Sequence, residues 1–394
     1  MYAIFVKPRV APPVCREAAV AANKPLSRPI RRLLAALASL LGGVFAPHAA
    51  RAATLPEDRA EAMVHIYKGG GVTATGPALL VRKNIADKVS LTGTYYLDAV
   101  SNASIDVVTT ASPYKERRND YGLAVDYAVR DSVLTFAVGA SREPDYNTRS
   151  FSLDIAQETF GGMTTVNVGF TRAADEVGKV GDRGFFDQAK HWQYRVGMTQ
   201  ILTPKWLASV NLEAVSDTGY LGNTYRVARV FGAAVPERHP RTRSSRAMKL
   251  RAVGSLDEAG QRAAVRGEYR YYWDNWDIKA HTVEAGYSRY LGESFLADGF
   301  VRYYTQNAAL FYSDNAQSET TYVSRNRQLS DFDNVVIGGK LTYDWKNQPG
   351  KYDLKANAGI ELYNLKYKNF TDIRNGSPYS LRAAVLQLYL TATY

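Results

Sequence analysis

Charged residues recur at alternate positions in the C-terminal half of the chain. Residues two apart on an extended strand lie on the same face, so these charges are expected to line common surfaces. The basic members are Lys249, Arg251, Arg266, Arg270 and Arg302, and the acidic members are Glu268, Glu284 and Asp298. If the strands that carry them enclose a pore, a basic wall facing acidic residues across that pore would favour the passage of anionic or zwitterionic solutes. The alternative is that cross-strand pairs, such as Arg266 or Arg270 with Glu284 or Asp298, only neutralise charge in the lumen.

Histidines offer little for catalysis. Nucleophilic hydrolysis needs a histidine held by a polar partner beside a serine. After residue 52 the histidines are His65, His191, His239 and His281, and they are scattered along the chain. Glu284 is near His281 in sequence, but strand alternation sends the two to opposite faces. The sequence therefore predicts no catalytic residue and no enzyme.

Cysteine usage and ligand spacing argue against metals and cofactors. The one cysteine is Cys15, which excludes a disulfide scaffold, a cysteine nucleophile, a thiolate zinc site and an iron–sulfur cluster in the body. Asp331 and Asp333 provide too few oxygens for calcium. The glycines at 69–71 lack the Lys-Ser/Thr of a phosphate loop. We expect no metal and no cofactor.

The formal net charge of +11 is concentrated at the N-terminus. Residues 1–52 hold eight basic residues and one acid, which leaves a net charge of +4 for residues 53–394. A nearly neutral body does not indicate a nucleic-acid partner.

The N-terminus has the pattern of an export signal. It consists of Arg28, Arg31 and Arg32, the apolar run 33–45 and the small-x-small site 50–52. Thirteen apolar residues are too few to span a bilayer about 30 Å thick. We expect cleavage before Ala53. Because residues 1–25 are long for such a signal and contain three prolines, translation is expected to start near Leu26.

The body from about residue 61 has an apolar period of two, which predicts strands. In 206–214 the even positions are apolar, and positions 209, 211 and 213 are Ser, Asn and Glu. The predicted strands are 61–70, 76–84, 88–97, 117–129, 132–142, 147–157, 162–173, 190–201, 205–216, 243–255, 261–273, 276–290, 294–306, 334–346, 351–366 and 379–394. Fourteen or eighteen strands are the alternatives to sixteen.

The links between these strands decide between a soluble sandwich and a membrane barrel. All seven links after even-numbered strands are short, whereas five of those after odd-numbered strands are long, at 98–116, 174–189, 217–242, 307–333 and 367–378. Short turns on one side and long loops on the other are typical of an outer-membrane β-barrel. Tyr and Trp at strand ends agree with interfacial girdles.

The last strand carries the most specific signal. Leu386, Leu388, Leu390 and Tyr394 form one apolar face that ends on an aromatic residue. This resembles the C-terminal signal that the barrel insertion machinery recognises, with Tyr where Phe is usual. We expect this strand to pair with the first and close the barrel.

Two long links are candidates for function, because functional residues often lie on loops. Segment 98–114 is apolar enough to pack inside the mouth, which would place Asp98, Asp106 and Tyr114 near the lumen. Loop 217–242 is basic, and we expect it to contact lipopolysaccharide phosphates, to narrow the pore, or to remain solvated.

Several segments resemble a Gram-negative outer-membrane β-barrel family of unknown function (DUF3570-like). They are 72–77 (VTATGP), 80–83 (LVRK), 95–101 (YYLDAVS), 103–114 (ASIDVVTTASPY), 240–243 (PRTR), 302–306 (RYYTQ) and Ala309 with 311–314 (FYSD). The resemblance covers nearly all of 60–394. It implies an exported barrel, supplies no ligand or catalytic residue, and associates such proteins loosely with exported redox proteins.

These patterns together predict an all-β chain, a signal peptide at 1–52 followed by an antiparallel up-and-down barrel at 53–394. The expected function is a passive channel or transporter for small solutes in the cell outer membrane. Alternatives are a non-conducting barrel that anchors an exported redox or lipoprotein partner, and a barrel enzyme.

Overall fold

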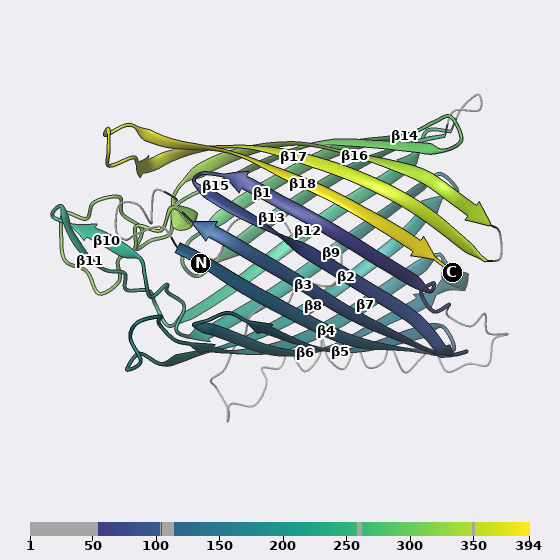
Figure 1. Ribbon diagram of the computed structural model, residues 1–394, viewed down its shortest axis with the longest axis horizontal. Coiled ribbons are helices and arrows are strands. Elements are labelled where there is room, and N and C mark those ends of the chain that lie inside the picture. The colour runs from purple at the N-terminus through teal and green to yellow at the C-terminus, as the bar shows by residue number, and fades with distance from the viewer. Residues whose placement is uncertain (1–53, 103, 105–113, 258–261, 349–350) are drawn as a thin grey trace.

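The computed structural model describes residues 54–102, 104, 114–257, 262–348 and 351–394. Sixteen strands form one closed antiparallel barrel, shown in Figure 1. They are β1 (Arg59–Gly69), β2 (Val72–Ala86), β3 (Val89–Asn102), β4 (Tyr114–Val129), β5 (Ser132–Arg142), β6 (Tyr146–Thr159), β7 (Thr164–Val177), β8 (Asp187–Thr203), β9 (Trp206–Gly219), β12 (Thr242–Ser255), β13 (Ala263–Asp274), β14 (Lys279–Leu291), β15 (Phe295–Gln306), β16 (Phe332–Gln348), β17 (Tyr352–Thr371) and β18 (Pro378–Thr393).

Each strand pairs with its neighbours in sequence, and β18 pairs with β1 to close the ring. One separate hairpin, β10 (Val227–Val230) and β11 (Ala233–Pro236), interrupts the link between β9 and β12. Two short 3-10 turns, Phe160–Gly162 and Arg327–Leu329, complete the regular structure of the described residues. In Figure 1 the hairpin and the long links gather at one end of the barrel, and β18 ends at the other.

The predicted sixteen strands are confirmed, as is the segregation of short and long links. The predicted ends were wrong on the long-loop side, where β3, β4, β8 and β17 extend several residues further. Beyond a membrane both faces of a strand meet polar surroundings, so the alternation that marks a strand fades there. Asp98 and Tyr114 therefore lie in β3 and β4 and not in a loop, whereas Asp106 lies outside the described residues.

The outer face of the barrel is apolar. On β18, Leu386, Leu388 and Leu390 are 37%, 52% and 52% exposed, and the same alternation places Leu212, Val301 and Ile337 outward on other strands. A continuous exposed apolar belt would be unstable in water and is stable in hydrocarbon. No helix in the described part of the chain is long and apolar enough to cross a bilayer.

The inner face differs between the two halves of the lumen. Toward the long-loop end, a buried apolar cluster lines β1, β2 and β16–β18, with Tyr67, Phe332, Tyr363, Tyr367 and Phe370 among its members. The remaining inner face carries ion pairs and hydrogen-bonded polar residues, such as Arg266 with Glu284. Along these strands the inner face thus becomes more apolar toward the long-loop end.

The two longest links, 220–241 and 307–331, pack against each other at the long-loop end. Val230 and Ala316 form a parallel bridge, and Arg238 and Val323 form an antiparallel one. Trp276, from the turn between β13 and β14, packs with Leu329 and Phe311 beneath them. We refer to these two links together as the outer cap.

Candidate functional site

A cavity of about 380 Å³ lies in the lumen between β1–β2 and β13–β18. These eight strands are consecutive in the ring, in the order β2, β1, β18 and on to β13. The charged lining residues are Arg59, Glu61, Arg266, Glu284, Asp298, Arg302, Lys340 and Glu361. Interleaved charges of both signs make this the part of the lumen best suited to contact a charged solute.

Glu284 on β14 is the centre of an ion-pair network. Its Oε2 accepts hydrogen bonds from Arg302, with Nε at 2.8 Å and Nη2 at 2.7 Å. Its Oε1 lies 3.3 Å from Nε of Arg266. Arg266 also donates to both carboxylate oxygens of Asp298, at 2.5 and 3.1 Å. Two arginines and two carboxylates therefore neutralise one another, and Ser288 donates a further hydrogen bond to Asp298 at 2.5 Å.

The network depends on a glycine. The strand register places Arg266 of β13 beside Gly286 of β14, which lies beside Phe300 of β15. A Cβ at Gly286 would lie 2.4 Å from Cζ of Arg266. Because Gly286 has no side chain, Arg266 can cross the middle strand to reach Asp298 on β15.

The same arrangement occurs again on the strands β6 to β8. Asp154, Gly169 and Arg195 form a row across β6, β7 and β8, and Arg195 donates to Asp154 at 2.8 Å. A Cβ at Gly169 would lie 2.0 Å from Oδ1 of Asp154. Glycines that face the lumen on a middle strand thus permit ion pairs between strands that are not neighbours.

The other residues of the predicted basic wall differ in whether they have an ion-pair partner. Lys249 pairs with Glu268 at 2.8 Å, and Arg270 lies 3.7 Å from Glu213, not beside the acids suggested by sequence. Arg251 has no ion-pair partner among the residues that the structure describes, and neither has Lys340. Four of the five residues predicted to form the basic wall therefore lie beside individual carboxylates, and only Arg251 does not.

Two histidines of the lumen, His65 and His191, are held by carboxylates that sequence reasoning missed, and His239 in the outer cap lies 3.2 Å from Glu237. Nε2 of His65 on β1 lies 2.8 Å from Oδ1 of Asp98 on β3, and the ring stacks on Tyr96 with centroids 4.7 Å apart. Gly76 of β2 lies between them: it pairs with His65, and a Cβ there would collide with the backbone of Leu97, next to Asp98. Sequence spacing alone does not show that His65, Gly76 and Asp98 form a row. The row becomes visible when the registers of the hairpins β1–β2 and β2–β3 are known.

His191 is the more enclosed of the two. Its Nε2 lies 2.6 Å from Asp175 on β7, and its Nδ1 lies 3.3 Å from Asp217 on β9. The partners of both lumen histidines are carboxylates and a tyrosine, and no hydroxyl of serine or threonine bonds to either ring among the described residues. His281 lies on the outer face, as alternation predicts, and its Nδ1 is hydrogen-bonded to the Tyr269 hydroxyl at 2.8 Å.

The residues predicted to form the insertion signal lie at the barrel seam. Leu386, Leu388, Leu390 and Tyr394 all have exposed side chains on the outer face. The amide of Tyr394 donates to the carbonyl of Asp58 at 3.1 Å, and Nζ of Lys83 lies 4.7 Å from the Tyr394 ring centroid. Their recognition by the insertion machinery remains a prediction.

A closed antiparallel barrel with an apolar outer belt and a charged lumen is the architecture of an integral outer-membrane protein. The protein is accordingly an outer-membrane β-barrel of the porin-like type. It belongs to the family described as "Protein of unknown function (DUF3570)", whose profile matches residues 101–382.

Solved structures similar to this chain are outer-membrane proteins of low identity. The siderophore receptor PirA from Pseudomonas aeruginosa is 12% identical over 80% of this chain and 60% of its own, with a TM-score of 0.44. CdiB from Acinetobacter baumannii is 9% identical over 85% and 60%, with a TM-score of 0.48. A bacterial polysaccharide outer membrane secretin is 8% identical over 85% and 99%, with a TM-score of 0.49. This chain thus spans 60% of the length of the first two. No curated protein matches it.

Proposed function

We propose that the protein is a passive outer-membrane channel for small solutes, and that solutes carrying both charge signs pass the network around Glu284. The observation that supports this is the lumen cavity itself, where Arg266 and Arg302 alternate with Glu284 and Asp298. Such a lining offers a zwitterion a partner for each of its charges. It offers little net attraction to a simple cation or anion.

The weak ion selectivity follows from the pairing. An isolated basic wall would attract anions, but each arginine of the network is within hydrogen-bond distance of a carboxylate. Arg251 of the predicted basic wall and Lys340 of the cavity lining have no ion-pair partner among the described residues, and these two are left to attract anions. We therefore expect a small preference for anions.

Single-channel conductance of the refolded mature protein (residues 53–394) in a planar bilayer under a salt gradient tests this proposal. Stepwise conductance with a reversal potential close to zero is the expected result. A folded barrel that never conducts contradicts a channel.

Glu284→Gln sharpens the test. Removing one charge about 4 Å from a solute in a water-filled lumen changes its energy by about 1 kcal/mol, or about fivefold in relative permeability. The anion-to-cation permeability ratio should rise toward that limit. Glu319→Gln, in an exposed part of the outer cap, is the control and should leave the ratio unchanged.

One observation favours a second candidate, the non-conducting barrel that anchors a partner. The outer cap is tied down: Glu237 accepts from Ser324 and from the amide of Arg325 at 2.9 and 2.8 Å, and Arg325 donates to Thr371 at 2.6 Å. A cap fixed in this way would keep the lumen closed, as expected of a non-conducting barrel that anchors an exported redox or lipoprotein partner. Absence of conductance, together with co-purification of such a partner, would support it.

The proposal includes no catalytic step. The lumen histidines are held by Asp98, Asp175 and Asp217, which supports a structural role for them. Lipid and lipopolysaccharide are the expected surroundings of the outer belt, and the barrel insertion machinery is the expected assembly partner. No cofactor or nucleic acid enters the proposal.

A further inference from the structure

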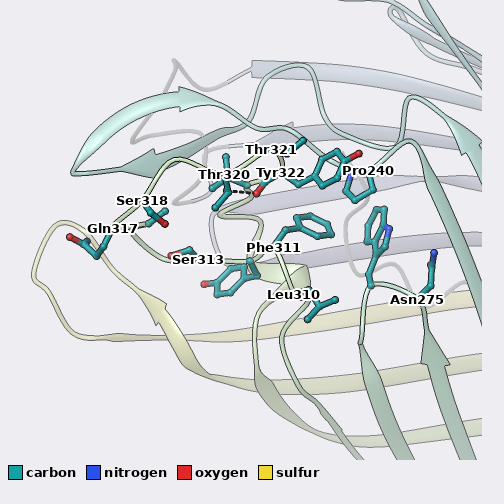
Figure 2. A pocket seen from close by; sticks show the side chains of 14 residues that line it. Pro240, Asn275, Leu310, Phe311, Ser313, Gln317, Ser318, Thr320, Thr321 and Tyr322 are labelled. Atoms are coloured by element: carbon teal, nitrogen blue, oxygen red, sulfur yellow. Dashed lines mark hydrogen bonds between the residues drawn. The ribbon is translucent and has the colours of Figure 1, made fainter.

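A second cavity, of about 490 Å³, opens at the outer cap and is separate from the lumen network. Figure 2 shows Phe311 in its middle, with Tyr322 and Thr320 on one side and Leu310 and Ser313 on the other. Its size is within the range of about 300–1,000 Å³ usual for small-molecule sites.

The floor of this cavity is rigid. The Trp276 indole nitrogen donates to the carbonyl of Thr242 at 2.9 Å, and its amide donates to Asp274 at 2.9 Å. The guanidinium of Arg243 lies 4.4 Å from its ring, and Phe311 packs edge-on with centroids 4.9 Å apart. Trp276 is only 4% exposed, so these contacts fix it beneath Phe311, whose half-buried ring faces the cavity. A ring supported in this way is ordered before a ligand arrives, which lowers the entropic cost of binding.

The rim of the cavity is polar and uncharged. Ser318, Thr321 and Tyr322 contribute hydroxyl groups that bond to no residue in the described part of the chain. Tyr322 is 44% exposed, so its ring can contact a ligand. None of the fourteen described lining residues is charged, in contrast to the lumen cavity.

We propose that this cavity binds a neutral saccharide. A pyranose ring has apolar C–H faces that pack on aromatic rings and hydroxyl edges that bond to Ser, Thr, Asn and Gln side chains. A charged ligand would lose water here and find no opposite charge. A purely apolar ligand would leave the free hydroxyls of the rim unpaired. The site goes beyond the proposed channel and does not depend on conduction.

Isothermal titration of the intact, detergent-solubilised protein tests the proposal. The neutral probes are maltohexaose, cellohexaose and isomaltohexaose, and hexagalacturonate is the charged probe of equal length. A second arm titrates the delipidated O-polysaccharide of the producing strain. Binding of a free hexasaccharide identifies a solute, whereas binding confined to the second arm identifies a saccharide of the cell surface.

Tyr322→Ala is the decisive variant, because the exposed ring supports no described hydrogen bond. We expect a loss of affinity of about tenfold for the neutral probe that binds, since a stacked aromatic ring is worth about that much. Phe186→Ala removes an aromatic ring that is 65% exposed on a different outer loop and should leave affinity unchanged. The proposal is overturned if no neutral saccharide of either arm binds, if hexagalacturonate binds as tightly, or if Tyr322→Ala binds like the wild type.

Discussion

Gly76, Gly169 and Gly286 each lie on the middle strand of a row of three and face the lumen. In each row the flanking strands carry the functional groups, such as Asp154 and Arg195 on either side of Gly169. Strand neighbours are normally about 5 Å apart, so a pair across an intervening strand must span about 10 Å. The flanking side chains can close that distance because the position between them carries no side chain.

Gly286→Ala adds one methyl group and tests whether the empty position at Gly286 is what allows Arg266 to reach Asp298. The new Cβ would meet the Arg266 guanidinium at 2.4 Å and push it away from Asp298. We expect the free energy of unfolding to fall by about 1–3 kcal/mol, because a charged hydrogen bond is lost in a partly buried site. Denaturant unfolding in lipid vesicles measures it. Gly267→Ala is the control, since no atom lies within 4 Å of its Cβ position; equal effects of the two substitutions would refute the crossing argument.

The sequence predicted which charges point inward and could not predict which of them meet. Alternation assigns Arg266, Glu284 and Asp298 to one face from period alone. Their contacts depend on the registers of two hairpins, and a register shift of two residues would preserve the alternation while changing every partner. For the same reason, the scattered positions of His65 and His191 in the sequence did not reveal the carboxylate partners that both have.

Among the elements, β18 shows most directly how one strand serves two environments. Leu388 faces outward and is 52% exposed, while Gln387 faces inward and lines the lumen cavity. The strand pairs with β17 on one side and with β1 on the other. It therefore combines a lipid surface, a lumen surface and the closing seam.

Leu388→Arg and Gln387→Arg form a matched pair on this strand. An arginine at mid-membrane on the lipid face costs about 2–4 kcal/mol of folding free energy, whereas a lumen position reaches water. We expect Leu388→Arg to show that loss in denaturant unfolding from vesicles, with a much smaller effect of Gln387→Arg. If both cost the same, the inward and outward assignment of β18 is incorrect.

The start of β1 is fastened to the end of β2 by Asp58, which precedes the barrel. Its carboxylate accepts from Lys83 Nζ and from the amide of Asn84, both at 2.5 Å. The Lys83 hydrogen bond, followed by that of Asn84, holds the pKa of Asp58 below its usual range. A depressed carboxyl pKa stabilises the fold above the unfolded value of about 4, and this contribution is lost as pH falls through the lower folded value.

Asp58→Asn should therefore lower the unfolding temperature at pH 7, and the difference from the wild type should shrink as pH falls below about 4. The effect is small because the pair is solvated and screened by salt. Gel-shift melting across pH 3–7 measures it, with Asp182→Asn on an outer loop as the control. A difference that persists unchanged at pH 3 would contradict the assignment.

The centres of the elements were predictable and their outer ends were not. Membrane-facing stretches such as 206–214 alternate strictly because one side meets lipid and the other the lumen. The hairpin β10–β11 has four residues in each strand and no membrane face, so its sequence carries no comparable signal. For the same reason, the packing of the two links into the outer cap could not be predicted from the sequence.

The whole molecule consists of a barrel wall that closes without the outer cap and a cap that rests on it. The wall is continuous through β9 and β12, which pair directly although the hairpin lies between them in sequence. The cap is held to itself by contacts such as Val230 with Ala316. Stability is thus expected to reside in the wall, and control of access in the cap.

Replacing residues 227–236 by a short Gly-Ser linker tests this division. The barrel should still fold and show heat-modifiable migration, because its sixteen-strand order does not include the hairpin. Conductance should rise, since the contact with Ala316 that helps to hold loop 307–331 is lost. A variant that cannot fold would place the hairpin in the folding core instead.

The pairing of β1 with β18 has a consequence for how the protein is made. Arg59 pairs with Thr393, so the contact that completes the ring joins the first and last strands of the barrel. Folding slows as contacts become more distant in sequence, and this closure is the most distant that the topology allows. Until the last strand is delivered, both ends of the growing sheet present unpaired hydrogen-bonding edges. We therefore expect the unclosed barrel to be prone to aggregation during that interval, and for longer than a smaller barrel would be.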